Sequence, residues 1–400
     1  MLNVITLDEA RRRLSDTFGS WKPGAETVSL DCATGRILDR PVEAKEFVPD
    51  FDRSTVDGYA LRAADTFGCG ENIPALLSLI GEVPMGETPN LTIQPGQCAY
   101  IPTGGCLPLG ADAVVMLEYA EDYGDGTVGI QSPCAPGAHL IFRGDDTAPG
   151  KELLSAGKTL GAKEIGALAA AGVVEVSVRA RPRVSIFSTG DELVSPEQIP
   201  APGQVRDVNG PMLSAALEEL GCCVCRRELL RDDPELLRRA IAEVCGDSDM
   251  VFLSGGSSVG VQDAACWVLS ELGTVLFHGL AIKPGKPTLL ADVGGVPVFG
   301  LPGHPAAAWF LFRLLAAPWI CGCTGRELWE KQSTFILDAG LPSNHGREEY
   351  VLVQLQGNRA IPLWSKSGLI TSLARADGYL RIPRDAEGIS AGSRVTVTLI

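Results

Sequence analysis

Residues 250–272 read MVFLSGGSSVGVQDAACWVLSEL. A buried strand is predicted at Met250–Leu253, because the run is entirely apolar, and a tight loop at Ser254–Gly260, which is rich in Gly and Ser. A helix is predicted to follow at Asp263–Leu272. A strand that passes through a Gly-rich loop into a helix is the unit from which parallel α/β sheets are built. This stretch therefore predicts an α/β domain.

The same alternation of strands and helices extends on both sides of this stretch. It is typical of a parallel sheet that is covered by helices on both faces. We therefore expect a three-layer α/β domain over residues 181–326. Its further strands are predicted at Val184–Phe187, Cys222–Leu230 and Val298–Leu301, and its further helices at Pro211–Leu220, Pro234–Cys245 and Pro305–Ile320.

Other regions of the chain have different patterns. Thr6, with Glu9 three residues later, is a capping box that opens a helix through about Phe18. A second, Ala-rich helix is predicted at Lys163–Ala171 and is expected to pack near the first. The predicted domains are a discontinuous N-terminal or linker domain (1–44 and 145–180), a β-rich domain (45–144), the α/β domain (181–326) and a C-terminal β domain (327–400) with strands at Thr334–Leu337, Tyr350–Leu355 and Val395–Ile400.

The chain is strongly acidic. Its 49 acidic and 34 basic side chains give a formal net charge of −15. A surface of this kind repels nucleic-acid phosphates, so we expect no nucleic-acid partner. Any phosphate-bearing ligand has to be held locally by cations, backbone amides or a metal ion. The alternative is that the charge serves only to keep the protein soluble.

The N-terminal residues 1–14 show no basic segment followed by an apolar one, so no signal peptide is predicted. The apolar stretches Leu168–Val174 and Pro305–Ile320 are interpreted as too short or too interrupted to span a bilayer. We therefore expect a cytoplasmic protein with no membrane association. The twelve cysteines, Cys222–Cys225 among them, lack a zinc-binding spacing and are expected to be mostly buried thiols in a reducing compartment.

Three loops follow predicted strands of the α/β domain: Ser188–Leu193, Ser254–Gly260 and Leu301–Pro305. Ligands of open α/β sheets bind at the carboxyl ends of the strands, so we expect the three loops to share one edge of the sheet. Ser254–Gly260 is the strongest candidate for an anion cradle, because glycines allow backbone N–H groups to turn toward a ligand and a helix N-terminus follows. The alternative is an ordinary tight turn, since the stretch is neither a P-loop nor G-x-G-x-x-G.

Carboxylates gather at the same predicted strand ends and helix starts. Several carboxylates beside a phosphate cradle repel the ligand unless a hard cation bridges them. We therefore predict that Asp191, Glu192 and Asp232 hold Mg²⁺ against a phosphate group, directly or through water. For Asp232, Asp233 and Asp263, the alternative is that they cap helix N-termini without any metal.

The segment Lys283-Pro284-Gly285-Lys286-Pro287 carries two cations on a loop stiffened by prolines. In an acidic protein this arrangement indicates an anion site. The alternative is a solvated turn in which both lysines only offset neighbouring acids.

Six stretches of the sequence occur in a distinctive order and spacing. They are Asp57–Ala60, Ile101–Glu118, Ser188–Leu193, Ser254–Gly260, Lys283–Pro287 and Leu301–Pro305. Together they resemble the MoeA/gephyrin family of molybdopterin molybdenumtransferases. The resemblance extends over essentially the whole chain, and six motifs in register are far more specific than any single one.

The resemblance implies a four-domain subunit in an elongated homodimer, whose third domain is similar to the enzyme that adenylylates molybdopterin. It also implies a reaction: molybdate is inserted into adenylylated molybdopterin, the adenylate is hydrolysed and AMP is released, with Mg²⁺ as the divalent cation. The active cleft would lie between the α/β domain of one subunit and the β-rich domain of the other. Expected partners are a molybdopterin adenylyltransferase and the enzymes that receive the cofactor.

The loops and the resemblance together define the expected site. We expect the carboxylates and Ser254–Gly260 to handle the pyrophosphate, and the two lysines, with Ser365, Lys366 and Ser367 of the terminal domain, to bind or guide molybdate. Catalytic residues are expected at Asp57, Thr103, Asp146, Glu192, Asp232 and Asp263. Substrate-binding residues are expected at Arg143, Ser254, Gly255, Gly256, Ser257, Ser258, Lys283, Lys286, Pro302, Pro305, Ser365 and Ser367.

The sequence departs from the family pattern in places. His304 stands where the third strand-end loop usually has Asn, and Val261-Gln262 stand where an acidic residue often follows the Gly/Ser loop. The basic stretch before Gly144 is thinner, although Arg143 is kept. Two alternatives therefore stay open: a paralogue acting on another oxyanion or nucleotide-linked pterin, and a non-catalytic scaffold.

Overall fold

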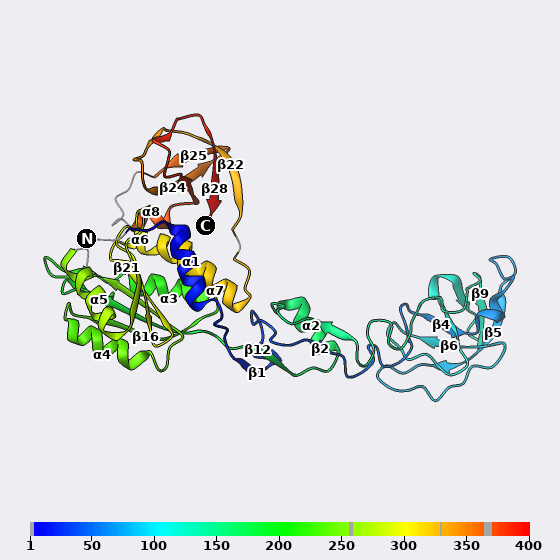
Figure 1. Cartoon of the computed structure of the whole chain (residues 1–400). Helices are drawn as coiled ribbons and strands as arrows, with labels where there is room; N and C mark the ends of the chain where they lie inside the picture. Colours follow the sequence, from blue (N-terminus) through cyan, green and yellow to red (C-terminus); the bar gives the residue numbers. More distant parts are fainter. Residues whose placement is uncertain (1–3, 256–258, 329, 364–369) are drawn as a thin grey trace. The chain divides into compact units, whose positions relative to one another are not determined.

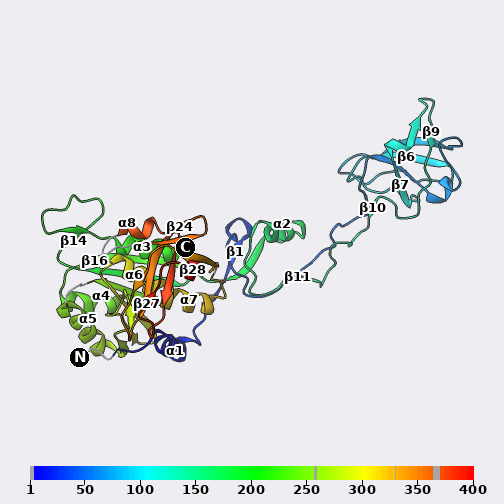
Figure 2. The same ribbon diagram turned by 90° about the horizontal axis from the view of Figure 1, so that it is seen from above.

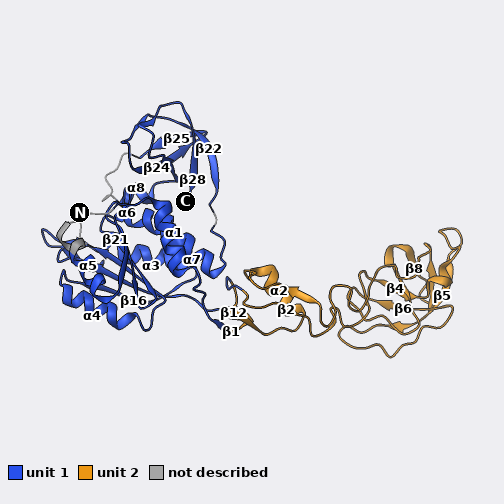
Figure 3. Ribbon diagram, in the orientation of Figure 1, with its two compact units in different colours: residues 1–26, 35–37, 179–400 blue, residues 27–34, 38–178 orange. Residues whose placement is uncertain are grey.

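The computed structural model describes the chain from residue 4 onward, apart from residues 256–258, 329 and 364–369 and the side chains of residues 259–263 (Figure 1). The chain divides into two compact units (Figure 3). The larger unit contains residues 1–26, 35–37 and 179–400, and the smaller unit contains residues 27–34 and 38–178.

A six-stranded sheet forms the centre of the larger unit, in the order β16-β13-β17-β21-β20-β18. The four predicted strands are its first four members, and they run parallel. The expectation of a wholly parallel sheet is wrong, because β20 pairs antiparallel with β21 and β18 pairs antiparallel with β20. The strands are β13 (Arg183–Thr189), β16 (Cys223–Leu230), β17 (Met250–Gly255), β18 (Thr274–His278), β20 (Leu289–Val293) and β21 (Val296–Pro302).

Helices cover both faces of this sheet, which confirms the predicted three-layer arrangement. Successive side chains of a strand point to opposite faces. Ile186 and Phe252 accordingly belong to one apolar cluster, and Phe187 and Val251 to another. The first cluster is completed by α3 (Asn209–Glu219), α6 (Pro305–Leu311) and α7 (Ala317–Thr324), and the second by α4 (Pro234–Val244) and α5 (Val259–Leu272).

The N-terminal helix α1 (Leu7–Phe18) packs on the α/β domain, beside α7 (Figures 1 and 2). Thr6 caps it by accepting a hydrogen bond from the backbone N–H of Glu9 at 3.2 Å, and Leu14 and Phe18 are buried in the first cluster. The Ala-rich helix α2 (Ala162–Ala170) instead contributes Leu168 to a separate cluster in the smaller unit. The two helices belong to different units, so the expectation that they pack near each other stays a prediction.

A single helical run extends over Pro305–Thr324, made of α6, a π-helical turn (Phe312–Ala316) and α7. Pro318 has no backbone N–H to donate, and the carbonyl of Leu314, four residues earlier, instead accepts hydrogen bonds from Arg11 Nε at 3.0 Å and Nη2 at 2.8 Å. The run has 20 residues and a mean hydropathy of 1.5, so it is longer than expected and could cross a bilayer by length and composition. However, 78% of its apolar window is buried inside the protein, as in the core helix of a domain.

The C-terminal part of the larger unit is a small β domain, as predicted. Strand β24 pairs with both β25 and β26, so five strands close into a barrel. The two-residue strand β19 (Ile282–Lys283) adds to β24 and ties the loop before β20 to this barrel. The barrel strands are β22 (Gln332–Leu337), β24 (Glu348–Gln356), β25 (Arg359–Pro362), β26 (Gly378–Ile382) and β28 (Arg394–Leu399), and a short helix, α8 (Ile370–Ala374), precedes β26.

The smaller unit contains a six-stranded β sheet in the order β7-β4-β6-β5-β9-β8, around a core that includes Tyr59, Leu61 and Val128. Its remaining segments form two-stranded pairs, β2 with β11, β1 with β12 and β3 with β10. The pairs formed by β2 and β1 bring the two halves of the predicted discontinuous segment together. The strands are β1 (Ala25–Ser29), β2 (Val42–Glu43), β3 (Arg53–Ser54), β4 (Gly58–Leu61), β5 (Ala75–Glu82), β6 (Gln97–Ile101), β7 (Ala113–Met116), β8 (Ala120–Asp122), β9 (Thr127–Ile130), β10 (Leu140–Ile141), β11 (Glu152–Leu154) and β12 (Glu175–Arg179).

Candidate active site

The carboxyl ends of the parallel strands lie along one edge of the central sheet. Thr189 of β13 lies opposite Gly255 of β17, and Gly255 lies opposite Pro302 of β21. On the other side, Thr189 lies opposite Leu230 of β16. Each of the three predicted loops begins at or beside one of these aligned positions. The expectation that they share one edge of the sheet is therefore confirmed.

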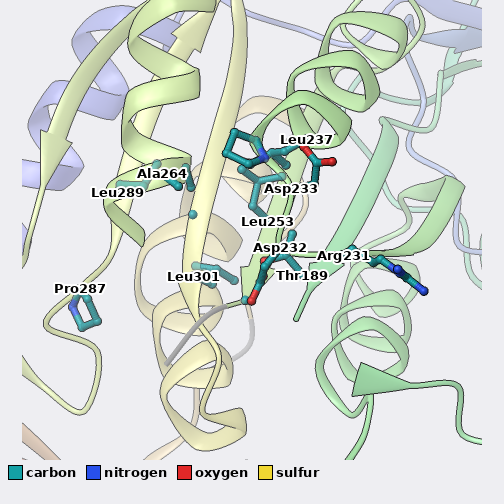
Figure 4. Close-up of a pocket in the computed structure, with 14 residues that line it drawn as sticks. Thr189, Arg231, Asp232, Asp233, Leu237, Leu253, Ala264, Pro287, Leu289 and Leu301 are labelled. Atoms are coloured by element: carbon teal, nitrogen blue, oxygen red, sulfur yellow. The ribbon is translucent and has the colours of Figure 1, made fainter. Parts of the chain in front are cut away.

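A cavity of about 170 Å³ opens at this edge (Figure 4), and we call it the strand-end cavity. Its polar lining comes from Thr189, Asp232 and Asp233, and Gly255 also lines it. Figure 4 shows Asp232 next to Thr189, whereas the side chain of Arg231 points away. The apolar part of the lining is formed by Leu237, Leu253, Leu289 and Leu301.

The three predicted metal ligands interact with one another beside this cavity. The backbone N–H of Asp232 donates to Asp191 Oδ1 at 3.3 Å. Burial raises the pKa of Asp232, and the negative charges of Glu192 and Asp191 raise it further. Asp232 Oδ1 is buried and has no hydrogen-bond partner among the described residues. This carboxylate therefore lies where a cation or a donor would stabilise it.

The cap of α4 is Asp233 and not Asp232. Asp233 Oδ1 accepts a hydrogen bond from the backbone N–H of Glu235 at 2.8 Å. Helix capping therefore accounts for the position of Asp233 but not for that of Asp232. Within the described part of the chain, no three His, Cys, Asp or Glu side chains are already arranged to hold a metal ion. The cysteines are unpaired by disulfides, and several are buried.

A buried asparagine that the sequence analysis did not identify connects two of the strand-end loops. Asn209, at the start of α3, is only 6% exposed. Its Nδ2 donates to Ser254 Oγ at 2.6 Å and to the backbone carbonyl of Gly303 at 2.8 Å. A carbonyl can only accept, so this contact fixes which end of the amide faces Gly303. Asn209 Oδ1 is then left buried without a partner among the described residues.

A second buried network supports the first loop. Asp207 Oδ1 accepts from Ser188 Oγ at 3.0 Å and from the backbone N–H of Gly210 at 3.1 Å. Asp207 and Asn209 thus anchor the loop after β13, the cradle and the loop after β21 to the start of one helix. In the sequence, an Asp and an Asn before a helical pattern resemble ordinary capping residues, and nothing in the pattern indicates a longer-range role.

A larger cavity of about 680 Å³ lies where residues 282–287 and the loop after β21 meet the C-terminal barrel. We call it the lysine cleft. Its charged lining is Lys283, Lys286, Arg347 and Glu349, and His304 also lines it. The two lysines of the predicted anion loop are therefore brought into one cavity with an arginine of the terminal domain. Arg347 was not identified from the sequence, because it lies about 60 residues from the lysines in no recognisable motif.

The charges in the lysine cleft are unevenly paired. Lys283 lies opposite Glu349 in the pairing of β19 with β24, and its Nζ lies 2.7 Å from Glu349 Oε1. Glu349 also accepts a hydrogen bond from Ser343 Oγ at 2.9 Å. Lys286 and Arg347 form no ion pair with any described residue. The unbalanced positive charge of the cleft therefore comes from Lys286 and Arg347, while that of Lys283 is partly offset.

In the smaller unit, two of the predicted catalytic residues are in contact. The backbone N–H of Thr103 donates to Asp57 Oδ1 at 2.7 Å. This contact follows from the pairing of β4 with β6, which places Gly58 opposite Ile101 and so brings the adjoining residues together. Both Asp57 and Thr103 are exposed.

The other two predicted residues of the smaller unit lie in the loop after β10. The guanidinium of Arg143 donates to Asp50 Oδ1 at 3.0 Å and lies over the ring of Phe47, 4.1 Å from its centroid. The backbone N–H of Asp146 donates to the carbonyl of Val48 at 3.0 Å. Both residues are therefore held by the segment 47–50, and the side chains of Arg143 and Asp146 are exposed.

The remaining predicted residues have different outcomes. Ser254 is buried against Asn209, and Pro302 lines the lysine cleft. Pro305 is the first residue of α6 and is not among the lining residues of either cavity. Gly256, Ser257, Ser258, Ser365, Lys366 and Ser367 lie outside the described residues, as does the side chain of Asp263, whose backbone belongs to α5.

Three family models match successive parts of the chain. Residues 5–172 match the MoeA N-terminal region (domains I and II), residues 185–321 match a probable molybdopterin-binding domain, and residues 334–400 match the MoeA C-terminal region (domain IV). The order of the matches agrees with the arrangement of the smaller unit, the α/β domain and the terminal barrel along the chain.

Named relatives and solved structures match over nearly the full length. Molybdopterin molybdenumtransferase 2 of Mycobacterium tuberculosis is 31% identical over 98% of each chain, and the molybdopterin molybdenumtransferase of a Nostoc species is 34% identical over 93% of this chain and 88% of its own. A molybdopterin biosynthesis MoeA protein of Pyrococcus horikoshii, solved by crystallography, superposes with a TM-score of 0.87 at 38% identity and 99% coverage of both chains. This chain therefore belongs to the MoeA family of molybdopterin molybdenumtransferases.

Proposed function

We propose that this protein completes molybdenum cofactor biosynthesis in the cytoplasm. In the proposed reaction it inserts molybdate into adenylylated molybdopterin, hydrolyses the adenylate and releases AMP. The curated relatives named molybdopterin molybdenumtransferase support the transferase activity.

The observation that carries the proposal is Asp232. Its Oδ1 is buried without a partner among the described residues, beside Asp191 and Glu192, at the edge where three strand-end loops meet. A pyrophosphate bound at this edge would meet the backbone of the Gly/Ser loop and a group of like-charged carboxylates. Only a bridging cation makes that combination favourable, which fits a substrate that carries a pyrophosphate.

The residues fit Mg²⁺ as that cation. Mg²⁺ commonly binds one or two carboxylates and completes its shell with substrate phosphate oxygens and water. Asp232 would hold it directly, with Asp191 and Glu192 near enough to contribute directly or through water. When bound, the ion neutralises charge on the phosphate oxygens. Asn209 would hold the loops of this site in place, and the aligned strand ends would set where those loops begin.

The lysine cleft is proposed as the place where molybdate is bound or guided. Molybdate is a small dianion, and a lysine is a compact charge that attracts such an ion without requiring a planar partner. Lys286 and Arg347 supply charge that no described carboxylate balances, and Lys283 is held in place by Glu349. Gly303, in the loop after β21, lines this cleft and also accepts the hydrogen bond from Asn209, so the proposed oxyanion and pyrophosphate sites adjoin one loop.

We further propose that the enzyme acts as a homodimer. Asp57, Thr103, Arg143 and Asp146 belong to the smaller unit, whereas the carboxylate group and the lysine cleft belong to the larger unit. In the proposed dimer, the smaller unit of one subunit completes the site on the larger unit of the other. The substrate would come from a molybdopterin adenylyltransferase, and the product would pass to enzymes that use the cofactor.

The cation assignment is tested by titrating Mg²⁺ while AMP release from adenylylated molybdopterin is measured with molybdate present. Glu192→Gln and Asp232→Asn are expected to need about tenfold more Mg²⁺ for half-maximal rate, the scale of one lost charge-assisted contact. Asp247→Asn, which changes an exposed carboxylate of the same domain, serves as the matched control and is expected to behave like the wild type. An unchanged Mg²⁺ requirement in both site variants would remove these residues from the metal site.

A further inference from the structure

A third cavity lies inside the larger unit, apart from the two cavities described above. Its volume is about 40 Å³. It is lined by the turn Gly35–Ile37, the segment Arg179–Pro182, the two residues after α3, the last residue of α7 and Arg326. Four of the lining residues are arginines, in a chain whose net charge is −15. We call this cavity the arginine pocket; its arginines are Arg36, Arg179, Arg181 and Arg326.

The positive charge of the arginine pocket is largely unbalanced. Arg36 is 8% exposed and pairs with Glu26. The other three arginines form no ion pair with a carboxylate among the described residues. Like charges held together in a partly desolvated cavity are unfavourable unless something balances them. The half-buried Arg179 and Arg326 and the exposed Arg181 therefore bring positive charge to the pocket that no described carboxylate balances.

The guanidinium groups are held in place by the backbone of neighbouring segments. Arg179 Nη1 donates to the carbonyl of Thr324 at 2.5 Å, and Arg326 Nη2 donates to the carbonyl of Gly35 at 2.9 Å. Arg36 Nη2 donates to the carbonyl of Arg179 at 2.8 Å. Each guanidinium has five N–H donors, so these bonds use only a minority of them. Arg326 Nε is buried and has no hydrogen-bond partner among the described residues.

Two glycines make room for these side chains. Gly221 has φ of +79° and Gly325 has φ of +75°, a backbone region that side-chain-bearing residues rarely adopt. A Cβ at Gly221 would lie 2.6 Å from Arg326 Nη2, and a Cβ at Gly325 would overlap Arg179 Nη1. The two arginines therefore occupy space that only glycine leaves open. The two glycines therefore allow two positively charged groups to lie at the same pocket.

We infer that the arginine pocket binds one small inorganic oxyanion, of the phosphate type. Several guanidinium groups around one cavity offer donors of the kind that bind the oxygens of a tetrahedral anion, and an anion would supply both the missing charge and an acceptor for Arg326 Nε. At about 40 Å³ the cavity is much smaller than the strand-end cavity (about 170 Å³) and the lysine cleft (about 680 Å³), so we expect it to take a small anion and not a whole nucleotide. The site therefore differs in size and place from the lysine cleft, and in charge as well from the strand-end cavity.

The position of the pocket in the chain gives the anion a structural consequence. The chain passes between the two units at residues 26/27, 34/35, 37/38 and 178/179. Gly35, Ile37 and Arg179 line the pocket and directly adjoin three of these crossings. A bound anion would join Arg36, Arg179 and Arg326, and so would fasten the segments of the larger unit from which the chain leaves it.

Equilibrium dialysis of the full-length protein with radiolabelled inorganic phosphate tests the inference. The wild type is expected to bind phosphate at this pocket, Arg326→Met to lose one site per chain, and Arg181→Met to bind there about tenfold more weakly, the scale of one charge-assisted hydrogen bond. Arg181 is exposed and donates no hydrogen bond to a described residue, so its replacement leaves the fold intact. Arg239→Met, an exposed arginine on α4, is the matched control.

The lysine cleft also attracts anions, so the sites have to be counted separately. In Lys286→Met protein the arginine-pocket site is expected to remain, and the double variant with Arg326→Met is expected to lose both. Molybdate should compete for the pocket and AMP should not, because the nucleoside does not fit. Hydrogen exchange of residues 35–37 and 179–182 should slow on phosphate addition in the wild type only. Unchanged binding in both Arg326→Met and Arg181→Met, competition by AMP at the pocket, or an equal loss in Arg239→Met would overturn the inference.

Discussion

Replacing Asn209 by alanine tests the buried connection between the strand-end loops. The change removes the bonds from Nδ2 to Ser254 Oγ at 2.6 Å and to the Gly303 carbonyl at 2.8 Å. Each bond contributes about 1 kcal/mol net, and the half-buried Gly303 carbonyl, which loses its donor, adds roughly 1 kcal/mol more. The substitution also removes the buried, unpartnered Asn209 Oδ1, which offsets part of this loss of stability. The expected decrease in the free energy of unfolding is therefore about 2–3 kcal/mol.

The chain offers a selective probe for this measurement. All six tryptophans, at positions 21, 267, 309, 319, 329 and 364, belong to the larger unit. Urea unfolding followed by tryptophan fluorescence therefore reports the unit that contains Asn209, without a signal from tryptophans elsewhere. This separation matters because a chain with two units need not unfold in a single step.

Two further variants sharpen the result. Asn209→Asp keeps the shape, but an ionised carboxylate cannot donate to Gly303, so we expect at least as large a loss at neutral pH. Asn358→Ala, at an exposed turn of the same unit, should change the stability by less than about 0.5 kcal/mol. In the activity assay, Asn209→Ala is also expected to release AMP about 10–100-fold more slowly than the wild type, since small misplacements of substrate-positioning loops have effects of this size. A loss of stability below about 0.5 kcal/mol in Asn209→Ala would refute the reasoning.

Three other predictions concern the charges. The pKa of Asp232 is raised, so the folded protein keeps this carboxyl proton to a higher pH than the unfolded chain does. The stability that the protonated carboxyl contributes is lost as the pH rises through the folded pKa, and without Mg²⁺ Asp232→Asn should therefore be more stable than the wild type at neutral pH. Urea midpoints that fall equally with pH in both proteins would contradict this. Lys283→Ala should weaken molybdate use by about tenfold and change the use of adenylylated molybdopterin little, whereas Glu349→Gln, which frees the lysine from its ion pair, should strengthen molybdate use. Each substrate is titrated separately, and equal losses for the two substrates in Lys283→Ala would exclude the assignment. Mixed under exchange conditions, inactive Asp57→Ala and Glu192→Ala proteins should regain activity as a heterodimer, and no recovery in a verified heterodimer would count against a shared site.

The architecture of the site was largely predictable, because it depends on local patterns. Apolar runs such as Met250–Leu253, followed by Gly-rich loops and helices, predict the parallel strands and hence the shared edge of their carboxyl ends. Strands β18 and β20 were not among the predicted strands, and the sequence pattern gives no direction for them either. Side-chain alternation reveals a strand but not whether its neighbour runs parallel or antiparallel to it.

The details that decide the chemistry depend on contacts between distant residues. Lys283 and Glu349 form an ion pair although several strands and helices separate them in the sequence, and no sequence pattern indicates this pair. Asn209 has the sequence context of a helix cap and acts instead on Ser254 and Gly303. The apolar face of α1 shows that the helix needs a partner, but not that the partner is α7.

The most direct test of the proposed function is a single turnover in which both products are measured in the same sample. Purified protein is mixed with adenylylated molybdopterin, Mg²⁺ and molybdate, and AMP and molybdenum-bound molybdopterin are quantified over time. The proposal predicts that the two products appear in equal amounts and at the same rate, and that both depend on molybdate. AMP released at the same rate without molybdate, or released with no molybdenum-bound product, would contradict it.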